Sequence, residues 1–232
     1  MKKSFVIIFW LCVCCSPGSE ELMQKGKEHL DKGEYDQALN YLSRAVENDP
    51  ENAEAHNAQA VAYFALEKFD SAIQHCTQAI IIDSTSYKPY YNRANALREL
   101  KEYEKAIADY TEALKLRANE KDIYINRGVT YFLQEKYQAA INDLEFALRI
   151  NSKDHTAYFN LGRIQLRLNE YEEASYNFMK VTEYAPNYAP AYFWLGIAQN
   201  QLQKTEEACV TLKKALSLGY QDAQAVIDTN CP

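Results

Sequence analysis

Glycine and proline are scarce in this sequence, with 7 and 6 residues in a chain of 232. Both residues interrupt regular backbone structure, so their scarcity leaves few positions for tight turns. Alanine, leucine and glutamate, which form helices readily, are common instead, and tyrosine occurs 18 times. The composition therefore favours an all-helical chain.

A surplus of basic residues is missing as well. The formal net charge is -7 at pH 7, and acidic residues outnumber basic ones by 32 to 25. Proteins that bind nucleic acids neutralise backbone phosphates with clustered lysine and arginine. We therefore expect no nucleic-acid partner. The hydrophobic share of 47% is enough for a packed, soluble core.

Motifs of catalysis and of metal binding are absent too. The chain has no H-E-x-x-H and no glycine-rich phosphate loop. A zinc site takes three or four ligands, whereas the four histidines lie apart, at His29, His56, His75 and His155. The many acidic residues follow solvent-facing helical positions and indicate a solvated face. We expect no enzyme, no metal and no cofactor.

A 34-residue period runs through most of the chain. The segment "YEKAIADYTEAL" at 103–114 has counterparts one period earlier, "FDSAIQHCTQAI" at 69–80, and one period later, "YQAAINDLEFAL" at 137–148. One series of alanines keeps this step at Ala38, Ala72, Ala106, Ala140, Ala174 and Ala208. A second series of small residues comprises Gly26, Ala60, Ala94, Gly128, Gly162 and Gly196. Six units without insertion follow from these series.

Each unit has the pattern of two helices. In the fourth unit, Tyr124, Gly128 and Tyr131 fall on one face of a first helix. Ala140 and Leu144 do the same for a second helix after the polar stretch "QEK". Small residues stand where two helices must approach closely. One such hairpin cannot bury its apolar face alone, so we expect the units to stack.

These features resemble the tetratricopeptide repeat family. The small residues match its consensus positions in both helices, and Pro50 and Pro186 match the proline that ends a repeat. The resemblance implies an all-α fold, a right-handed α-solenoid of six 34-residue helical hairpins with a C-terminal cap. The repeats it implies are 19–52, 53–86, 87–120, 121–154, 155–188 and 189–222.

The segment after the last unit predicts a capping helix over 223–232. Ala223, Val226 and Ile227 form a small apolar stripe with polar residues outside it, as terminal repeats need for solubility. Counted from the turn before the cap, Cys209 and Cys231 are nearly level across an antiparallel hairpin. In an exported protein these two cysteines could form a disulfide, and we state this bond as a hypothesis.

The resemblance also implies a superhelix whose first helices line a concave groove. The groove positions lie about one residue further round the helix than the core face, and they are rich in aromatic and aliphatic residues. They are Asn57, Val61, Phe64, Tyr91, Asn95, Arg98, Ile125, Val129, Phe132, Phe159, Arg163, Leu166, Phe193, Ile197 and Asn200. We expect a protein or peptide ligand there, with the arginines as anchors for a carboxylate. The alternative is that tight coiling covers these rings.

The start of the chain has the features of an export signal. Lys2 and Lys3 precede the apolar run 5–13, which is too short to span a bilayer, since a span needs about 20 residues. The stretch "WLCVCCSPG" at 10–18 resembles a bacterial lipobox, in which the signal is cut before a cysteine that is then acylated. We expect a lipoprotein signal over 1–15 and a tether over 16–18. Cys15 is the preferred lipidation site, and Cys14 is the alternative.

Together these features predict a lipid-anchored scaffold of the bacterial envelope, which binds a partner in its concave groove and supports assembly or regulation of an envelope complex. The architecture resembles the small repeat lipoproteins of pilus-secretin and outer-membrane assembly. Such a protein is exported and sits at the outer membrane, facing the periplasm or the surface, with its N-terminal lipid as its only membrane contact. Two alternatives are a soluble periplasmic adaptor or chaperone, and a regulatory subunit of an envelope enzyme.

Overall fold

The computed structural model describes residues 18–231, which form thirteen α-helices and no β-strand. The predicted signal peptide, with Cys14 and Cys15, lies outside these residues. The first helices of the six hairpins are α1 (Ser19–Asp31), α3 (Ala53–Ala65), α5 (Tyr87–Glu99), α7 (Lys121–Leu133), α9 (His155–Leu168) and α11 (Ala189–Gln201). The second helices are α2 (Tyr35–Asn48), α4 (Phe69–Ile82), α6 (Tyr103–Leu116), α8 (Tyr137–Ile150), α10 (Tyr171–Tyr184) and α12 (Thr205–Ser217). A last helix, α13 (Asp222–Asn230), follows the sixth hairpin.

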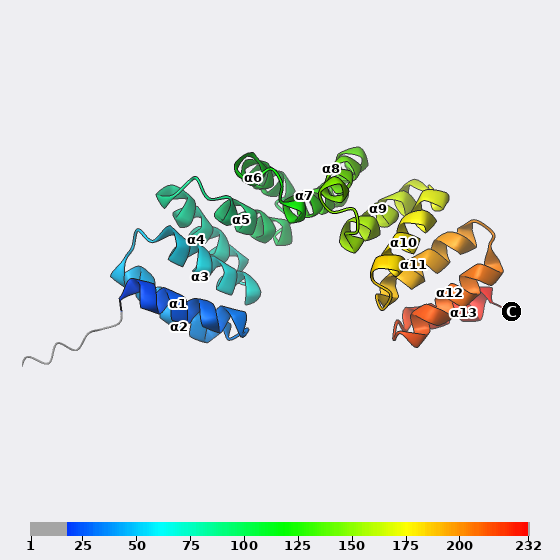
Figure 1. The fold of residues 1–232 in the computed structure, drawn as a ribbon, viewed down its shortest axis with the longest axis horizontal. Helices are drawn as coiled ribbons and strands as arrows, with labels where there is room; N and C mark the ends of the chain where they lie inside the picture. The colour runs from blue at the N-terminus through cyan, green and yellow to red at the C-terminus, as the bar shows by residue number, and fades with distance from the viewer. Residues whose placement is uncertain (1–17, 232) are drawn as a thin grey trace, which may run out of the picture.

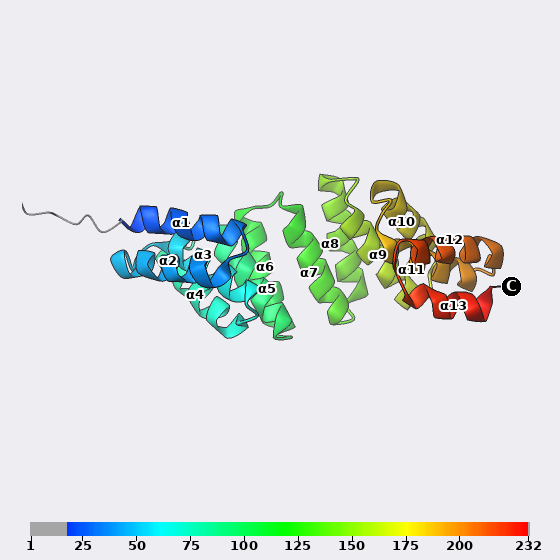
Figure 2. The same cartoon turned by 90° about the horizontal axis from the view of Figure 1, so that it is seen from below.

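The hairpins stack side by side into an arch whose two ends lie far apart (Figure 1). The first helices of neighbouring hairpins contact one another from α1 to α11, whereas each second helix contacts its own hairpin and the first helix of the next. At the middle of the arch, α5 and α7 lie on the inner side and α6 and α8 on the outer side (Figures 1 and 2). The first helices therefore line the concave face. The predicted all-α solenoid is confirmed.

In the turn inside each hairpin, one residue has a positive φ angle. This residue is glycine in the first hairpin and another amino acid in the other five. The φ angle is 74° at Gly33, but it is 57° at Glu67, 62° at Lys101 and 59° at Glu135. Asn169 and Gln203 continue the series at 61° and 62°. A left-handed residue after a helix lets the next amides bond back to the last carbonyls, as when Lys68 N donates to Tyr63 O. The same turn thus recurs in a chain with few glycines.

Small residues allow the two helices of a hairpin to touch. A Cβ atom at Gly162 would lie 2.8 Å from the Cζ atom of Phe178, whose ring is fully buried. The alanines of the second helices, such as Ala140 and Ala174, are themselves 0% exposed. Packing at this density explains why the two periodic series admit only glycine and alanine at these points.

Two ion pairs, each between a buried aspartate and a half-buried arginine, join helices within a hairpin and to the preceding one. Arg127 of α7 donates from Nε and Nη2 to both carboxylate oxygens of Asp143 on α8, at 2.8 Å each. Its Nη1 donates to Thr111 Oγ1 of the preceding hairpin at 2.9 Å. We call this arrangement an arginine stitch. A second stitch, one unit earlier, joins Arg93, Asp109 and Thr77.

The C-terminal end of the array is tied covalently. A disulfide joins Cys209 of α12 to Cys231, with a Cα–Cα distance of 5.6 Å. Cys76, the free cysteine of the described residues, is buried in α4. Among residues 18–231, no helix is both long and apolar enough to cross a membrane.

Replacing Asp143 by alanine should leave the Arg127 guanidinium partly buried without its carboxylate. We expect the free energy of unfolding to fall by about 3 kcal/mol, measured by urea denaturation followed by circular dichroism. The double variant Arg127→Met with Asp143→Leu leaves no unpaired charge and should stay within about 1 kcal/mol of the parent protein. A single variant as stable as the parent would show that the stitch adds no stability.

Replacing Cys231 by serine removes the bond that closes a loop of 22 residues. In the chain-entropy account, the end of the array should lose about 3 kcal/mol of stability. Hydrogen exchange of the α12 and α13 amides measures this loss, and the amides of α1 to α4 serve as the internal control. Equal protection of α12 and α13 in both proteins would contradict the expectation.

Candidate functional site

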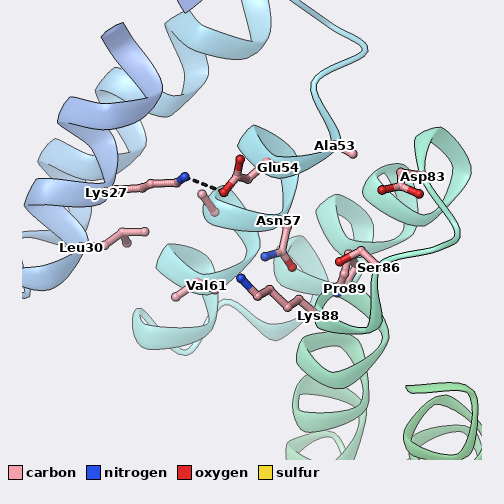
Figure 3. Close-up of a pocket in the computed structure, with 11 residues that line it drawn as sticks. Lys27, Leu30, Ala53, Glu54, Asn57, Val61, Asp83, Ser86, Lys88 and Pro89 are labelled. Carbon is pink, nitrogen blue, oxygen red and sulfur yellow. Dashed lines mark hydrogen bonds and ion pairs between the residues drawn. The ribbon is translucent and has the colours of Figure 1, made fainter. Parts of the chain in front are cut away.

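A cleft of about 400 Å³ lies on the concave face near the N-terminal end. Helices α1, α3 and α5 contribute its walls, with Lys27 and Leu30 on one side and Lys88 and Pro89 on the other. Figure 3 shows the α3 side chains between these walls, and Lys88 extends from α5 toward Val61. We call this space the α1–α5 cleft.

A second cleft of about 290 Å³ continues it toward the middle of the arch. Tyr87, Tyr91 and Asn92 of α5 line it, together with Asp122 and Ile123 of α7. Asn57, Val61 and Lys88 line both clefts. The two clefts are therefore continuous, and we call them together the concave groove.

The concave groove carries charges of both signs beside an apolar strip. Lys27 Nζ lies 2.5 Å from Glu54 Oε1, and the dashed line in Figure 3 marks this ion pair. Within residues 18–231, Lys88 has no ion pair, and its side chain is exposed. Val61 is 37% exposed, which is high for a large apolar residue on an inner helix. The groove thus offers a free ammonium next to an apolar contact.

Side-chain amides hold the helices of the groove in register. Asn92 Nδ2 donates to Asn57 Oδ1 at 2.9 Å and so links α5 to α3. Asn126 Nδ2 donates to the Tyr91 hydroxyl at 2.7 Å and links α7 to α5 in the same way. Because these bonds run between successive hairpins, the groove lining is fixed by the stacking itself.

The structure brings three of the predicted groove residues, Asn57, Val61 and Tyr91, into these clefts. The two predicted arginine anchors differ from each other. Arg98 pairs with Glu99 at 2.9 Å and donates to Asn126 Oδ1 at 2.9 Å, so its charge is already matched. Arg163 has no carboxylate partner within residues 18–231 and lies 5.1 Å from the ring centre of Phe132.

Several other predicted groove residues are taken up by packing. Ile125 and Phe193 are 6% and 9% exposed and belong to the hydrophobic core. Phe64 packs edge-on against Phe69, and Phe159 does so against Phe178. Asn95 accepts a hydrogen bond from the Tyr110 hydroxyl at 2.6 Å. Val129, Phe132, Leu166, Ile197 and Asn200 are half-buried.

The sequence reading overlooked the charged residues at the second position of three first helices, α3, α5 and α7. Glu54, Lys88 and Asp122 recur at one-repeat intervals and line the concave groove. The same step that revealed the small residues could therefore have revealed this ladder of charges. It was missed because the predicted groove positions started about one helical turn further along each helix.

Outside the groove, the titratable side chains Cys76, His56 and His75 pack between helices. Burial raises the pKa of the Cys76 thiol to about 12, so this thiol stays protonated near neutral pH. His56 and His75 face each other with their Nδ1 atoms 3.4 Å apart. Burial, followed by the neighbouring His56, lowers the pKa of His75. Over the described part of the chain, no three histidine, cysteine or acidic side chains are grouped to hold a metal ion.

Models of the tetratricopeptide repeat family match almost the whole described chain. The matches cover residues 23–87, 75–108, 94–134, 121–187 and 190–218. The chain belongs to the tetratricopeptide repeat family, whose members are generally scaffolds that bind other proteins. No protein of curated function matches the sequence.

Solved bacterial structures have the same fold. PilW, a widely conserved type IV pilus biogenesis factor, is 21% identical, with a TM-score of 0.82 over 90% of this chain and 98% of its own. PilF of Pseudomonas aeruginosa is 23% identical, with a TM-score of 0.77 over 89% of this chain and 96% of its own. YrrB, described as having an unusual peptide-binding site, is 23% identical, with a TM-score of 0.65 over 81% and 97%. At these identities the likeness concerns the fold.

Proposed function

We propose that this protein is a non-enzymatic scaffold of the bacterial envelope that binds a segment of a partner protein in the concave groove. The observation that carries the proposal is the groove itself, where Lys88 and Val61 stay accessible between two fixed walls. An extended segment or a helix of a partner can place an apolar side chain against Val61 and an acidic group at Lys88.

The proposal also includes a lipid anchor at Cys15. Its support is the sequence at the start of the chain, in which a basic start and an apolar run precede the cysteines. A bacterial lipoprotein carries more than one acyl chain, which is what stable anchoring requires. The envelope roles suggested by the names of PilF and PilW agree with this location.

The groove is tested by a photo-crosslinking amino acid at position 61, used in cells that make the protein with its own signal. We expect it to trap a partner, and we expect Lys88→Glu to weaken capture about tenfold by placing like charges together. The matched control places the crosslinker at position 210, on an exposed valine of α12, together with Lys213→Glu. The groove is the wrong site if the same partner is trapped with equal yield from position 210.

The anchor is tested by detergent partitioning and labelled-palmitate uptake. The parent protein should enter the detergent phase and take up label, because its acyl chains partition into hydrocarbon. Cys15→Ser should abolish both, while Cys14→Ser should leave both in place. Loss of the label in Cys14→Ser alone would move the site to Cys14. A parent protein that stays aqueous and unlabelled would refute the anchor and leave the groove proposal standing.

A further inference from the structure

The outer side of the arch has an open cleft of about 470 Å³ between the fourth and fifth hairpins. Ile141 and Leu148 of α8 and Leu161 of α9 give it apolar walls. Tyr176 of α10, which is 53% exposed, stands at its edge. We call it the outer cleft. Most of its lining comes from the second helices α8 and α10, and it shares no lining residue with the concave groove.

The outer cleft occupies the place of a missing arginine stitch. One unit earlier, the position of Leu161 holds Arg127, which binds Asp143 and Thr111. In the outer cleft the equivalents of those two partners are Asn177 and Glu145. No arginine is among the described residues that line the outer cleft. The two preceding contacts between hairpins each have one, Arg93 and Arg127.

The charges around the cleft differ from those of the equivalent groove between the second and third hairpins. That groove is lined by three acidic and two basic residues, namely Asp70, Glu102, Asp109, Arg93 and Lys105. The outer cleft is lined by three acidic residues and no basic one, with Glu145, Glu172 and Glu173 at its rim. Within residues 18–231, none of these glutamates has an ion pair. Its net charge is thus -3, compared with -1 in the equivalent groove.

Asn177 brings an amide oxygen to the outer cleft that receives no hydrogen bond from the described residues. Asn177, which lines the cleft, is 6% exposed and donates from Nδ2 to Gln165 Oε1 at 2.6 Å and to the Glu173 carbonyl oxygen at 3.0 Å. Its Oδ1 atom accepts no hydrogen bond from any described residue. The side chain is buried as a whole, but this oxygen is not itself buried and is open to the cleft. A ligand in the cleft can therefore donate a hydrogen bond to it.

We propose that the outer cleft is a docking site for an arginine side chain of a partner protein. The guanidinium would take the place that Arg127 has one junction earlier, with its methylenes on Leu161 and Ile141. Glu145 and Glu173 would receive its charge, and Asn177 Oδ1 would accept one of its N–H groups. Arginine fits better than lysine, since its planar fork bonds several acceptors at once while its stem lies on apolar surface.

Three blocked five-residue peptides test the proposal, each with leucine at both ends and either arginine, lysine or citrulline at the centre. Chemical-shift titration of the isotope-labelled protein gives their dissociation constants and the helices affected. We expect the arginine peptide to shift residues of α8, α9 and α10, and to bind about tenfold more tightly than its neutral citrulline counterpart. The lysine peptide should fall between them.

A variant that rebuilds the stitch supplies the decisive comparison. Glu145→Thr, Leu161→Arg and Asn177→Asp together place a guanidinium of the chain itself in the cleft, so the variant should fold and lose about tenfold in affinity for the arginine peptide. Should this variant fail to fold, Glu172→Gln with Glu173→Gln provides the same test without touching the core. Glu206→Gln with Glu207→Gln, at the same positions one unit later, is the control and should change nothing.

Two results would overturn the proposal. One is equal binding of the arginine and citrulline peptides. The other is a dimer that forms through this cleft, detected by sedimentation, and that does not dissociate when the arginine peptide is added. Lys88→Glu should leave peptide binding at the outer cleft unchanged, so the proposal stands or falls apart from the concave groove.

Discussion

A single hairpin of this chain cannot keep its apolar face from water, and every other feature depends on that constraint. Stacking each hairpin on the next buries the face, and the constant length of the repeat lets the same contact be made again. First helices of neighbouring hairpins then contact one another on one side of the stack, whereas second helices α2 to α12 make no comparable contact with one another on the other side. The arch, its concave groove and its outer cleft all result from this difference.

The sequence predicts the fold because each rule acts locally and then repeats. Gly162 and Ala174 are small because two helices touch there, and a helix that touches a neighbour must keep that residue small in every unit. The turns were harder to predict. Glu67 and Lys101 adopt positive φ angles without being glycine, and no composition rule marks glutamate or lysine for that conformation.

The site could be predicted only in part because accessibility depends on neighbours. Periodicity places Ile125 and Val61 on the same face of their helices, yet Ile125 is 6% exposed and Val61 is 37% exposed. The difference comes from how closely the adjacent hairpins pack, which one unit's pattern does not contain. Arg98 is unavailable as an anchor for the same reason, since Glu99 beside it and Asn126 in the next hairpin accept its hydrogen bonds.

The disulfide between Cys209 and Cys231 gives the array a direction. A row of repeats held only by neighbour contacts frays from both ends, since an end unit has a neighbour on one side only. With the C-terminal end bonded, we expect local opening to be most frequent at α1 and α2. Helix α1 supplies Lys27 and Leu30 to one wall of the concave groove. We therefore expect this wall of the proposed groove to open more readily than the rest of the array, and a segment bound there would stabilise α1 against that opening.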